Sequence, residues 1–312
     1  MKIFVSIASY CDELLFFTIK DCMVKASKPE NIFFGIVDQN ISTQRAEIDE
    51  LGFKNQIKYV YINNIDTFGV SWARNIAFSL LDGEDFLLQI DSHMLFEKDW
   101  DTTLLNQHSD LKMISQKPII TTYPYDFSFD ENSNPTFNKP SGKSVLVLRP
   151  HPDTPLEKDS ARIRFRAEHK YTDAPVLGCH IAGGFIFASS DFIEEIPYDP
   201  FLYFIGEEQS LSIRAYTRGW DIYHPIWIPL YHQYKNKKIE YVSQHWNKDA
   251  DNKRVLSSAH LTNRTIKRIN RLLYGDGMKN SIYGLGNIKT MDEFIAFSGI
   301  DYKNKKINKI EF

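Results

Sequence analysis

Two residue types that commonly bind metals, Asp91 and His93, flank Ser92 at the end of the apolar segment DFLLQID. A turn at this point would usually carry Gly, Asn or Pro. Because strand side chains two positions apart point the same way, the carboxylate and the imidazole can bind one divalent ion. Mg²⁺ prefers oxygen ligands, so the imidazole favours Mn²⁺ or another transition metal. The alternative roles are a cap on a following helix for Asp91 and a hydrogen-bonded core histidine for His93.

His232 is the third candidate ligand, because it ends another apolar segment, PLYH. A site with three protein ligands keeps coordination positions open for substrate oxygens, whereas a structural site is closed. The alternative is a histidine packed among aromatic neighbours, namely Trp227, Tyr231 and Tyr234.

A pair of carboxylates, Glu207 and Glu208, directly follows Gly206 at the predicted start of a helix. One of them can simply cap the helix, since acidic groups are favoured in a first turn. The other can reach a substrate hydroxyl. Gly183 and Gly184 fall at a predicted strand, where missing side chains mark a bulge or let a ligand approach the backbone.

Arg74, in the segment SWARN, lies near the start of another predicted helix. A guanidinium at this place can neutralise a phosphate bidentately. The alternative is an ordinary surface arginine.

Strands and helices alternate along the first part of the chain. The apolar segments are 2–10, 31–40, 57–63 and 85–91, and helix-like spacing occurs at 12–26 and 70–81. This alternation predicts an α/β fold with a mixed, mostly parallel sheet and helices on both faces. Ligands bind beyond the carboxyl ends of such strands, so SIASYCD, VDQN and IDSH should meet along one edge. Neither GxGxxG nor GxxxxGK[ST] is available to bind phosphates.

The segment from 123 to about 175 is rich in Pro, Asn, Asp and Ser and contains one strand-like stretch, SVLVL. We predict a long insertion around the site there, followed by a helix at 207–219 and one strand at 221–232. Residues 1–240 form the predicted catalytic domain, and 241–312 a basic, mostly helical extension packed on it. The lysines and arginines of 248–271 predict either a solvated helix face or a surface that contacts phosphate or polymer.

Composition narrows the classes of protein. A net charge of −3 argues against a dedicated nucleic-acid binder. The three cysteines share no CxxC spacing and fit a reducing compartment. Asp12 and Glu13 interrupt the apolar N-terminal run before any cleavage site, and no stretch approaches the roughly 18 apolar residues of a membrane span. We therefore predict a soluble, cytoplasmic protein with no transmembrane segment.

A series of segments, in matching order from residue 3 to 302, resembles the family of cytoplasmic polypeptide (hydroxyproline) N-acetylglucosaminyltransferases and its bacterial relatives. They are IFVSIASYCDELL, FFGIVDQN, SWARNIAFSLLDGEDFLLQIDSHMLF, ITTYP, AGGFIFAS, IPYDPFLYFIGEEQSLSIRAYTRGWDIYHP and YGLG. The resemblance implies a GT-A fold and an enzyme dependent on Mn²⁺ or Mg²⁺. It implies transfer of GlcNAc from UDP-GlcNAc to an acceptor hydroxyl with retention at the anomeric carbon.

The pattern is also similar to the mucin-type polypeptide N-acetylgalactosaminyltransferases, whose metal-binding DxH and later histidine correspond to Asp91, His93 and His232. The resemblance implies that Gly183, Gly184, Gly206 and Glu207 line the sugar pocket. It implies that Ala8, Ser9, Tyr10 and Arg74 meet the nucleotide. Residues 126–172 match least, so the acceptor, a protein hydroxyl or a saccharide, stays open.

The residues leave several roles undecided. Glu207 and Glu208 are nucleophile candidates in a double displacement and sugar-hydroxyl binders in a front-face reaction, and we favour binders. Arg264 or Arg268 can add positive charge near the departing phosphate. A metal-dependent nucleotide-sugar hydrolase and a non-catalytic carbohydrate-binding module are the alternative functions.

Overall fold

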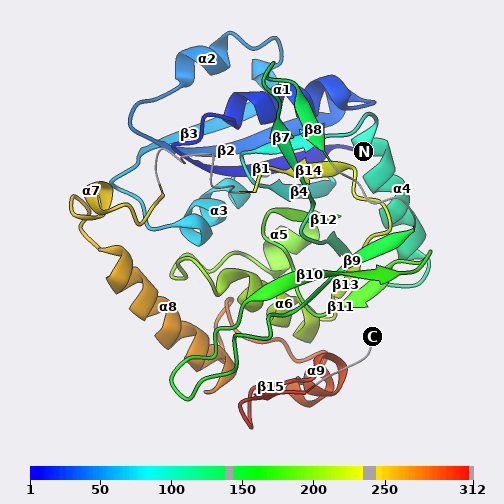
Figure 1. Cartoon of the computed structure of the whole chain (residues 1–312), viewed down its shortest axis with the longest axis vertical. Helices are drawn as coiled ribbons and strands as arrows, with labels where there is room; N and C mark the ends of the chain where they lie inside the picture. The colour runs from blue at the N-terminus through cyan, green and yellow to red at the C-terminus, as the bar shows by residue number, and fades with distance from the viewer. Residues whose placement is uncertain (138–142, 235–243, 309–312) are drawn as a thin grey trace.

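The computed structural model of the chain describes residues 1–137, 143–234 and 244–308, with a large eight-stranded sheet at its centre (Figure 1). The sheet order is β11-β13-β6-β12-β4-β1-β2-β3. In chain order its strands are β1 (Ile3–Tyr10), β2 (Ile32–Asn40), β3 (Ile57–Asn63), β4 (Phe86–Ile90), β6 (Pro118–Thr121), β11 (Val176–Gly178), β12 (Phe185–Ser189) and β13 (Asp221–His224). β12 runs antiparallel to β4 and β6, and β11 antiparallel to β13, while the other neighbouring pairs are parallel. The predicted mixed, mostly parallel sheet is confirmed.

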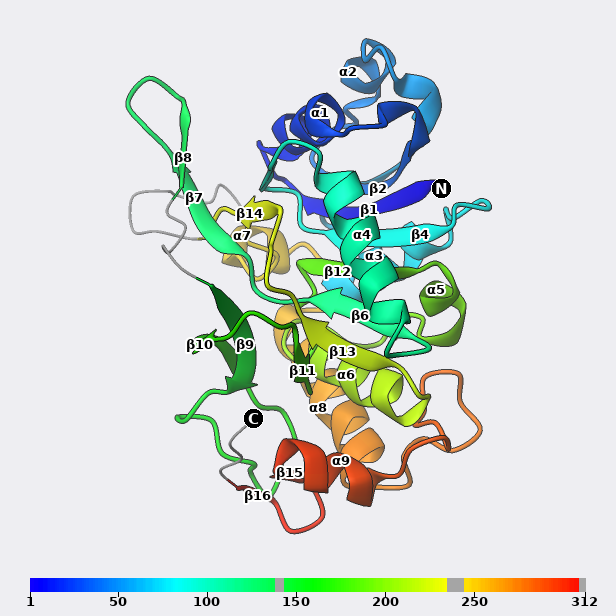
Figure 2. The same cartoon turned by 90° about the vertical axis from the view of Figure 1, so that its right-hand side faces the viewer.

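Helices cover both faces of this sheet because strand side chains alternate between its faces. One hydrophobic cluster joins Ile3, Val5 and Ile7 to α1 (Leu15–Lys25) and α4 (Trp100–Lys112). The cluster on the other side joins Phe4 to α3, α5 and α6. These helices span Val70–Phe78, Asp191–Glu195 and Glu207–Thr217. Figure 2 shows α4 crossing one face of the sheet.

A second, four-stranded sheet lies beyond the carboxyl end of β4, in the order β5-β14-β7-β8. Its strands are β5 (Met94–Phe96), β14 (Leu230–His232), β7 (Tyr125–Phe129) and β8 (Pro135–Phe137). Antiparallel pairing sets His232 opposite Met94, the residue that follows His93. The hairpin of β7 and β8 projects from the body of the molecule (Figure 2).

Two expectations about regular structure were wrong. The predicted single strand over 221–232 is divided between β13 in the large sheet and β14 in the small one. Pro225 and Pro229 stand between them, and proline cannot donate to a continuous ladder. The predicted insertion at 123–175 is also more regular than its composition suggests, because it holds β7, β8 and the hairpin of β9 (Ser144–Pro150) with β10 (Phe165–Tyr171).

The remaining elements are η1 (Pro29–Asn31), α2 (Arg45–Asp49), η2 (Lys54–Gln56), α7 (Lys248–Asp251), α8 (Ser258–Leu273), α9 (Met291–Ser298), β15 (Ile300–Asp301) and β16 (Lys306–Ile307). The Ser257 side chain caps α8 by accepting the His260 N–H. A third cluster packs apolar residues of α8 and α9 against Ile213 of α6. The predicted domain boundary at 240/241 lies outside the described residues. Among the described helices, none has the length and apolar character to cross a membrane.

Candidate metal and donor site

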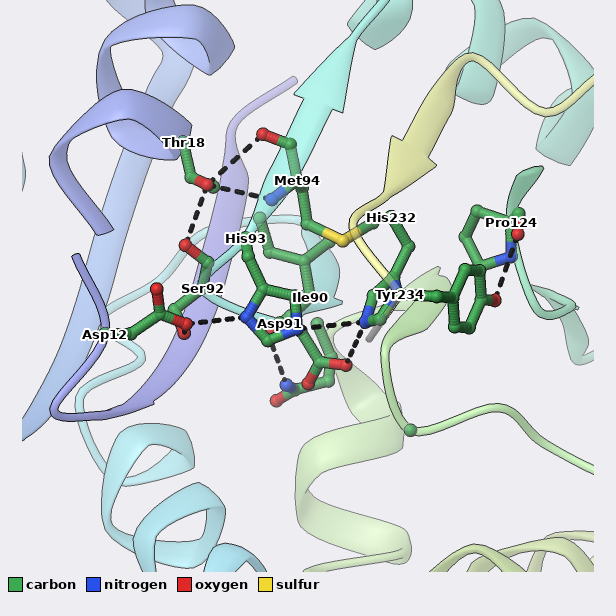
Figure 3. Close-up of polar contacts among 12 residues, drawn as sticks. Asp12, Thr18, Ile90, Asp91, Ser92, His93, Met94, Pro124, His232 and Tyr234 are labelled. Atoms are coloured by element: carbon green, nitrogen blue, oxygen red, sulfur yellow. Dashed lines mark hydrogen bonds and ion pairs between the residues drawn. The ribbon is translucent and has the colours of Figure 1, made fainter. Parts of the chain in front are cut away.

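Asp91, His93 and His232 converge at the carboxyl edge of the large sheet (Figure 3). Asp91 and His93 belong to the turn between β4 and β5, and His232 ends β14. One ligand atom from each residue lies within 4.8 Å of the others. The two histidine Nε2 atoms are 3.0 Å apart, and His232 Nε2 is 3.3 Å from Asp91 Oδ2.

The donor set fits a divalent transition ion. Asp12 Oδ2 is 2.6 Å from His93 Nδ1, and because a carboxylate only accepts, Nδ1 carries the proton. In its neutral form His93 then carries its lone pair on Nε2, which points at His232. A carboxylate that fixes the tautomer of a ligating histidine is a common feature of metal sites. One carboxylate and two imidazoles are ligands that Mn²⁺ accepts.

Asp12 is itself held in place by two further hydrogen bonds. Ser92 Oγ donates to its Oδ2 at 2.6 Å, and the Leu14 N–H donates to its Oδ1 at 2.9 Å. Burial raises the pKa of Asp12, but these donors and His93 lower it overall. The Asp12 carboxylate is therefore ionised and oriented before any metal binds.

Arg74 forms an ion pair with Asp91, with Nη2 2.7 Å from Oδ1. The arginine is 4% exposed, which excludes the surface alternative. Burial raises the pKa of Asp91, but His232 and Arg74 lower it well below its usual range. Asp91 thus stays charged, with one oxygen on Arg74 and the other beside His232.

Gly183 and Gly184 are glycines because charged side chains occupy the space of a Cβ. A Cβ on Gly184 would lie 2.5 Å from Asp91 Oδ2, and one on Gly183 would lie 2.4 Å from Arg74 Nη1. The pair therefore forms the backbone wall against which the Arg74–Asp91 ion pair packs.

The two glutamates begin α6 after Gly206, whose φ of 137° favours glycine. Glu208 accepts hydrogen bonds from the Gly183 N–H at 2.6 Å and the Tyr123 hydroxyl at 2.8 Å, and His180 Nε2 lies 3.5 Å away. Burial raises the pKa of Glu208, but His180 and the other donors lower it overall.

Glu207 has the opposite electrostatic environment. Burial and the charge of Glu208 raise its pKa to about 7, although Arg74 acts against them. Its Oε2 is buried and has no hydrogen-bond partner among the described residues. The pair thus combines one firmly ionised carboxylate with one that changes charge near neutral pH.

All these groups surround one cavity of about 740 Å³. The expected site residues that line it are Ala8, Tyr10, Arg74, Asp91, His93, Gly184, Gly206, Glu207, Glu208 and His232. Ser9 is fully buried and, like Gly183, is not among the lining residues. Arg264 and Arg268 line a different, smaller hollow.

Sequence reasoning missed a network at the Tyr10 end of the cavity. Arg254 donates to the Tyr10 hydroxyl, to the His245 carbonyl and, at 3.2 Å, to the Asn64 carbonyl. His245 lies 2.9 Å from both the Thr67 and Tyr203 hydroxyls. No sequence motif indicates these partners, because Arg254 is 244 positions from Tyr10.

Asp12 was also missed, although SIASYCD marked the right edge of the sheet. We expect Asp12→Asn to weaken Mn²⁺ binding roughly ten- to a hundredfold, the usual cost of losing such an outer partner. Asparagine keeps an acceptor for the Leu14 N–H but loses the charge that holds His93. Calorimetric titration of Mn²⁺ checks this, and unchanged affinity would show that Asp12 does not orient the ligand.

Comparison with known proteins shows the family of this chain. Residues 2–50 and 42–304 match the family model described as Glycosyltransferase (GlcNAc). The structure of GalNAc-T7 with UDP, GalNAc and Mn²⁺ is similar at a TM-score of 0.53 and 16% identity, over 95% of this chain and 55% of that one. This chain therefore spans about half the length of GalNAc-T7. The structure of S. aureus TarS 1-349 with UDP-GlcNAc matches at a TM-score of 0.44 and 13% identity, over 89% of this chain and 74% of that one.

No curated protein sequence gives a significant match. The likeness to GalNAc-T7 bears out the expected GT-A fold. With its family model matched over nearly the whole chain and its polar groups gathered at one sheet edge, the chain belongs to the Glycosyltransferase (GlcNAc) family.

Proposed function

We propose that this chain is a metal-dependent, retaining glycosyltransferase that moves GlcNAc from UDP-GlcNAc to an acceptor hydroxyl. The observation that carries the proposal is the convergence of Asp91, His93 and His232 on a cavity also lined by Glu207 and Glu208. The family description names GlcNAc, and the similar GalNAc-T7 structure holds UDP, a sugar and Mn²⁺. The motif resemblance to polypeptide GlcNAc-transferases and a cytoplasmic location belong to the same proposal.

In this proposal the metal ligands and Arg74 stabilise the charge of the departing diphosphate. A divalent cation, when bound, supplies Lewis-acid stabilisation of the charge that builds on the phosphates. Asp91, His93 and His232 would hold it. Arg74 keeps Asp91 ionised and aimed, and its own charge adds to the positive potential at this end of the cavity.

The glutamates bind the sugar in the same proposal. Glu208 is anchored by Gly183 and Tyr123, so it is a fixed acceptor. Glu207 Oε2 is buried and without a described partner, so a sugar hydroxyl would satisfy it. Trapping decides between this role and a nucleophile, because only a nucleophile would yield a glycosyl adduct on either glutamate.

Two further groups of cavity residues suit the nucleotide and the acceptor. Ala8 and Tyr10 at the end of β1 are the proposed nucleotide contacts, whereas Ser9 between them is buried and does not line the cavity. Phe204 and Trp246 also line the cavity, with ring centroids 5.1 Å apart, and both are partly exposed. Exposed aromatic faces of this kind suit an acceptor that carries rings.

Donor binding and product analysis test the function. A panel of nucleotide sugars is titrated with Mn²⁺ and with EDTA, and the preferred donor is then incubated with candidate protein and saccharide acceptors. We expect UDP-GlcNAc to bind best, and only with metal, and the sugar to appear on an acceptor. Hydrolysis without transfer would assign a hydrolase, and binding of saccharide without turnover would assign a carbohydrate-binding module.

A further inference from the structure

A second hollow, of about 290 Å³, lies on the surface of α8. Its lining residues, which define the basic groove, are Phe201, Arg264, Lys267, Arg268 and Arg271. Apart from one phenylalanine, all of them are cations. The proposed transferase reaction gives this groove no role.

The spacing of the four cations places them on one face of α8. They occupy positions i, i+3, i+4 and i+7, which align along a helix. The adjoining face packs Leu261, Ile269 and Leu272 into the interior, so the register of the helix is set by burial. At the rise of an α-helix, the cations extend over about 10 Å. That length suits several negative charges in a row rather than one phosphate.

Carboxylates neutralise only part of this positive charge. Asp199 pairs with Arg268, and Asp276 pairs with Arg271 at 3.2 Å. Arg264 and Lys267 have no ion pair within the ranges 1–137, 143–234 and 244–308. Arg264 donates from Nε to the Phe201 carbonyl at 3.1 Å, but its Nη2 is buried and has no partner among these residues. A buried donor left in this way costs free energy unless a ligand or water accepts from it.

A further buried cation stands close to the basic groove. Arg214 is fully buried, and its Nε and Nη1 have no hydrogen-bond partner among the described residues. Its guanidinium lies 5.7 Å from the centre of the Tyr283 ring, and that of Arg268 lies 5.6 Å from the same ring. A further guanidinium therefore lies near Arg268, beyond the groove's own lining.

Helix α8, which carries the basic groove, packs against residues that line the donor cavity. Thr265 Oγ1 of α8 accepts the Tyr203 N–H at 2.6 Å, and a Cβ on Gly206 would meet Ile269 at 3.1 Å. Phe201 lines the groove, while Tyr203 to Gly206 line the cavity. Along the chain, the groove residue Phe201 and the cavity residue Tyr203 are therefore only two positions apart.

We propose that the basic groove binds the phosphate groups of the acceptor, an anionic chain with repeated phosphodiesters, and holds it beside the donor cavity. This inference rests on the proposed transferase function for its meaning, but the binding itself does not depend on it. A membrane surface fits less well, because the apolar residues of α8 are buried and leave no wedge to insert. Nucleic acid fits less well because one aromatic ring offers little for bases to stack on.

Binding of inorganic polyphosphate to the whole chain tests the groove without donor or acceptor. We expect binding that weakens steeply with salt and at least tenfold in the double variant Arg264→Ala/Lys267→Ala, neither of which has a described ion pair to lose. The matched control is Lys20→Ala/Lys54→Ala, which removes two exposed lysines from α1 and η2 and should bind as the parent does. UDP binding with Mn²⁺ should stay unchanged in both variants.

The outcomes separate the groove from the active site. Equal polyphosphate binding by the two double variants would overturn the proposal, as would stronger binding to anionic vesicles or to a single-stranded oligonucleotide than to polyphosphate. If the parent chain does not bind UDP in the presence of Mn²⁺, this would instead count against the proposed function. As a kinetic check, a phosphodiester-linked oligosaccharide should have an acceptor KM at least tenfold below that of an uncharged oligosaccharide of the same length, and Arg264→Ala/Lys267→Ala should remove this difference. Equal KM values in the parent chain would also overturn the proposal.

Discussion

Asp91→Asn is expected to abolish metal-dependent UDP binding and to lower kcat/KM for transfer by at least about 10²-fold, the order seen when one preorganised electrostatic group is removed. The substitution keeps the volume beside Gly184 but removes the charge that one oxygen offers to the cation and the other to Arg74. It also leaves the buried guanidinium without its counter-charge, which costs about 3 kcal/mol of stability or more.

Two companion variants separate lost function from lost stability. Asp199→Asn breaks another buried pair, with Arg268 outside the cavity, and should destabilise the fold while Mn²⁺ binding persists. The double variant Arg74→Met/Asp91→Asn should regain part of this stability, since the guanidinium is no longer left without its counter-charge, but it should not regain Mn²⁺ binding. Calorimetric titration and urea unfolding measure both. Retention of metal-dependent UDP binding within threefold in Asp91→Asn would contradict the assigned role.

Glu207→Gln is expected to stabilise the metal-free fold at pH 8 while weakening catalysis. The folded-state pKa of Glu207, about 7, lies above the ordinary value of 4.5. Between these pH values the folded chain keeps a proton that the unfolded chain has released, so its stability falls as pH rises. The full penalty is about 3 kcal/mol, and an uncharged glutamine does not suffer it. The variant and parent should therefore unfold alike at pH 4 and differ by about 1–3 kcal/mol at pH 8.

Catalytic activity should fall, because a glutamine oxygen is a weaker hydrogen-bond acceptor for the sugar hydroxyl than a carboxylate. We expect a roughly ten- to hundredfold lower kcat/KM, the range of a hydrogen bond to a charged group. Glu208→Gln is the matched control in urea unfolding with EDTA. Its carboxylate is held ionised by Gly183, Tyr123 and His180, so its loss should destabilise the fold at pH 8. If Glu207→Gln is no more stable than the parent at pH 8, folding does not raise the pKa of Glu207.

Local patterns in the sequence predicted the large sheet well, because each strand and helix carries its own periodicity. The polar ends of β1, β2 and β4 could be placed on one edge for the same reason, since parallel strands end together. That placement also indicated Asp91 and His93 as candidate metal ligands. The fold class was thus available from residues close in sequence.

Groups that depend on long-range pairing were harder to predict. His232 reaches His93 only because β14 pairs with β5, and the sequence suggested a single strand through Pro225 and Pro229 instead. Asp12 holds His93 across 81 positions, without a motif to mark it.

The roles of Arg74 and of the glycine pair were also incompletely predicted. Spacing indicates that Arg74 lies near the start of a helix, but not that it is buried against Asp91. Gly183 and Gly184 were expected to admit a ligand, whereas the structure shows that they also leave room for the Arg74–Asp91 ion pair. Close approach of this kind depends on the packed structure and leaves no periodic signal.

The proposed function depends on Asp91, His93 and His232 binding one divalent cation together. Electron spin-echo spectroscopy of bound Mn²⁺, in protein carrying ¹⁵N-labelled histidine, tests it most directly. We expect coupling to two histidine nitrogens, with one lost in His93→Ala and the other in His232→Ala. Mn²⁺ that binds the parent chain without coupling to either histidine would contradict it.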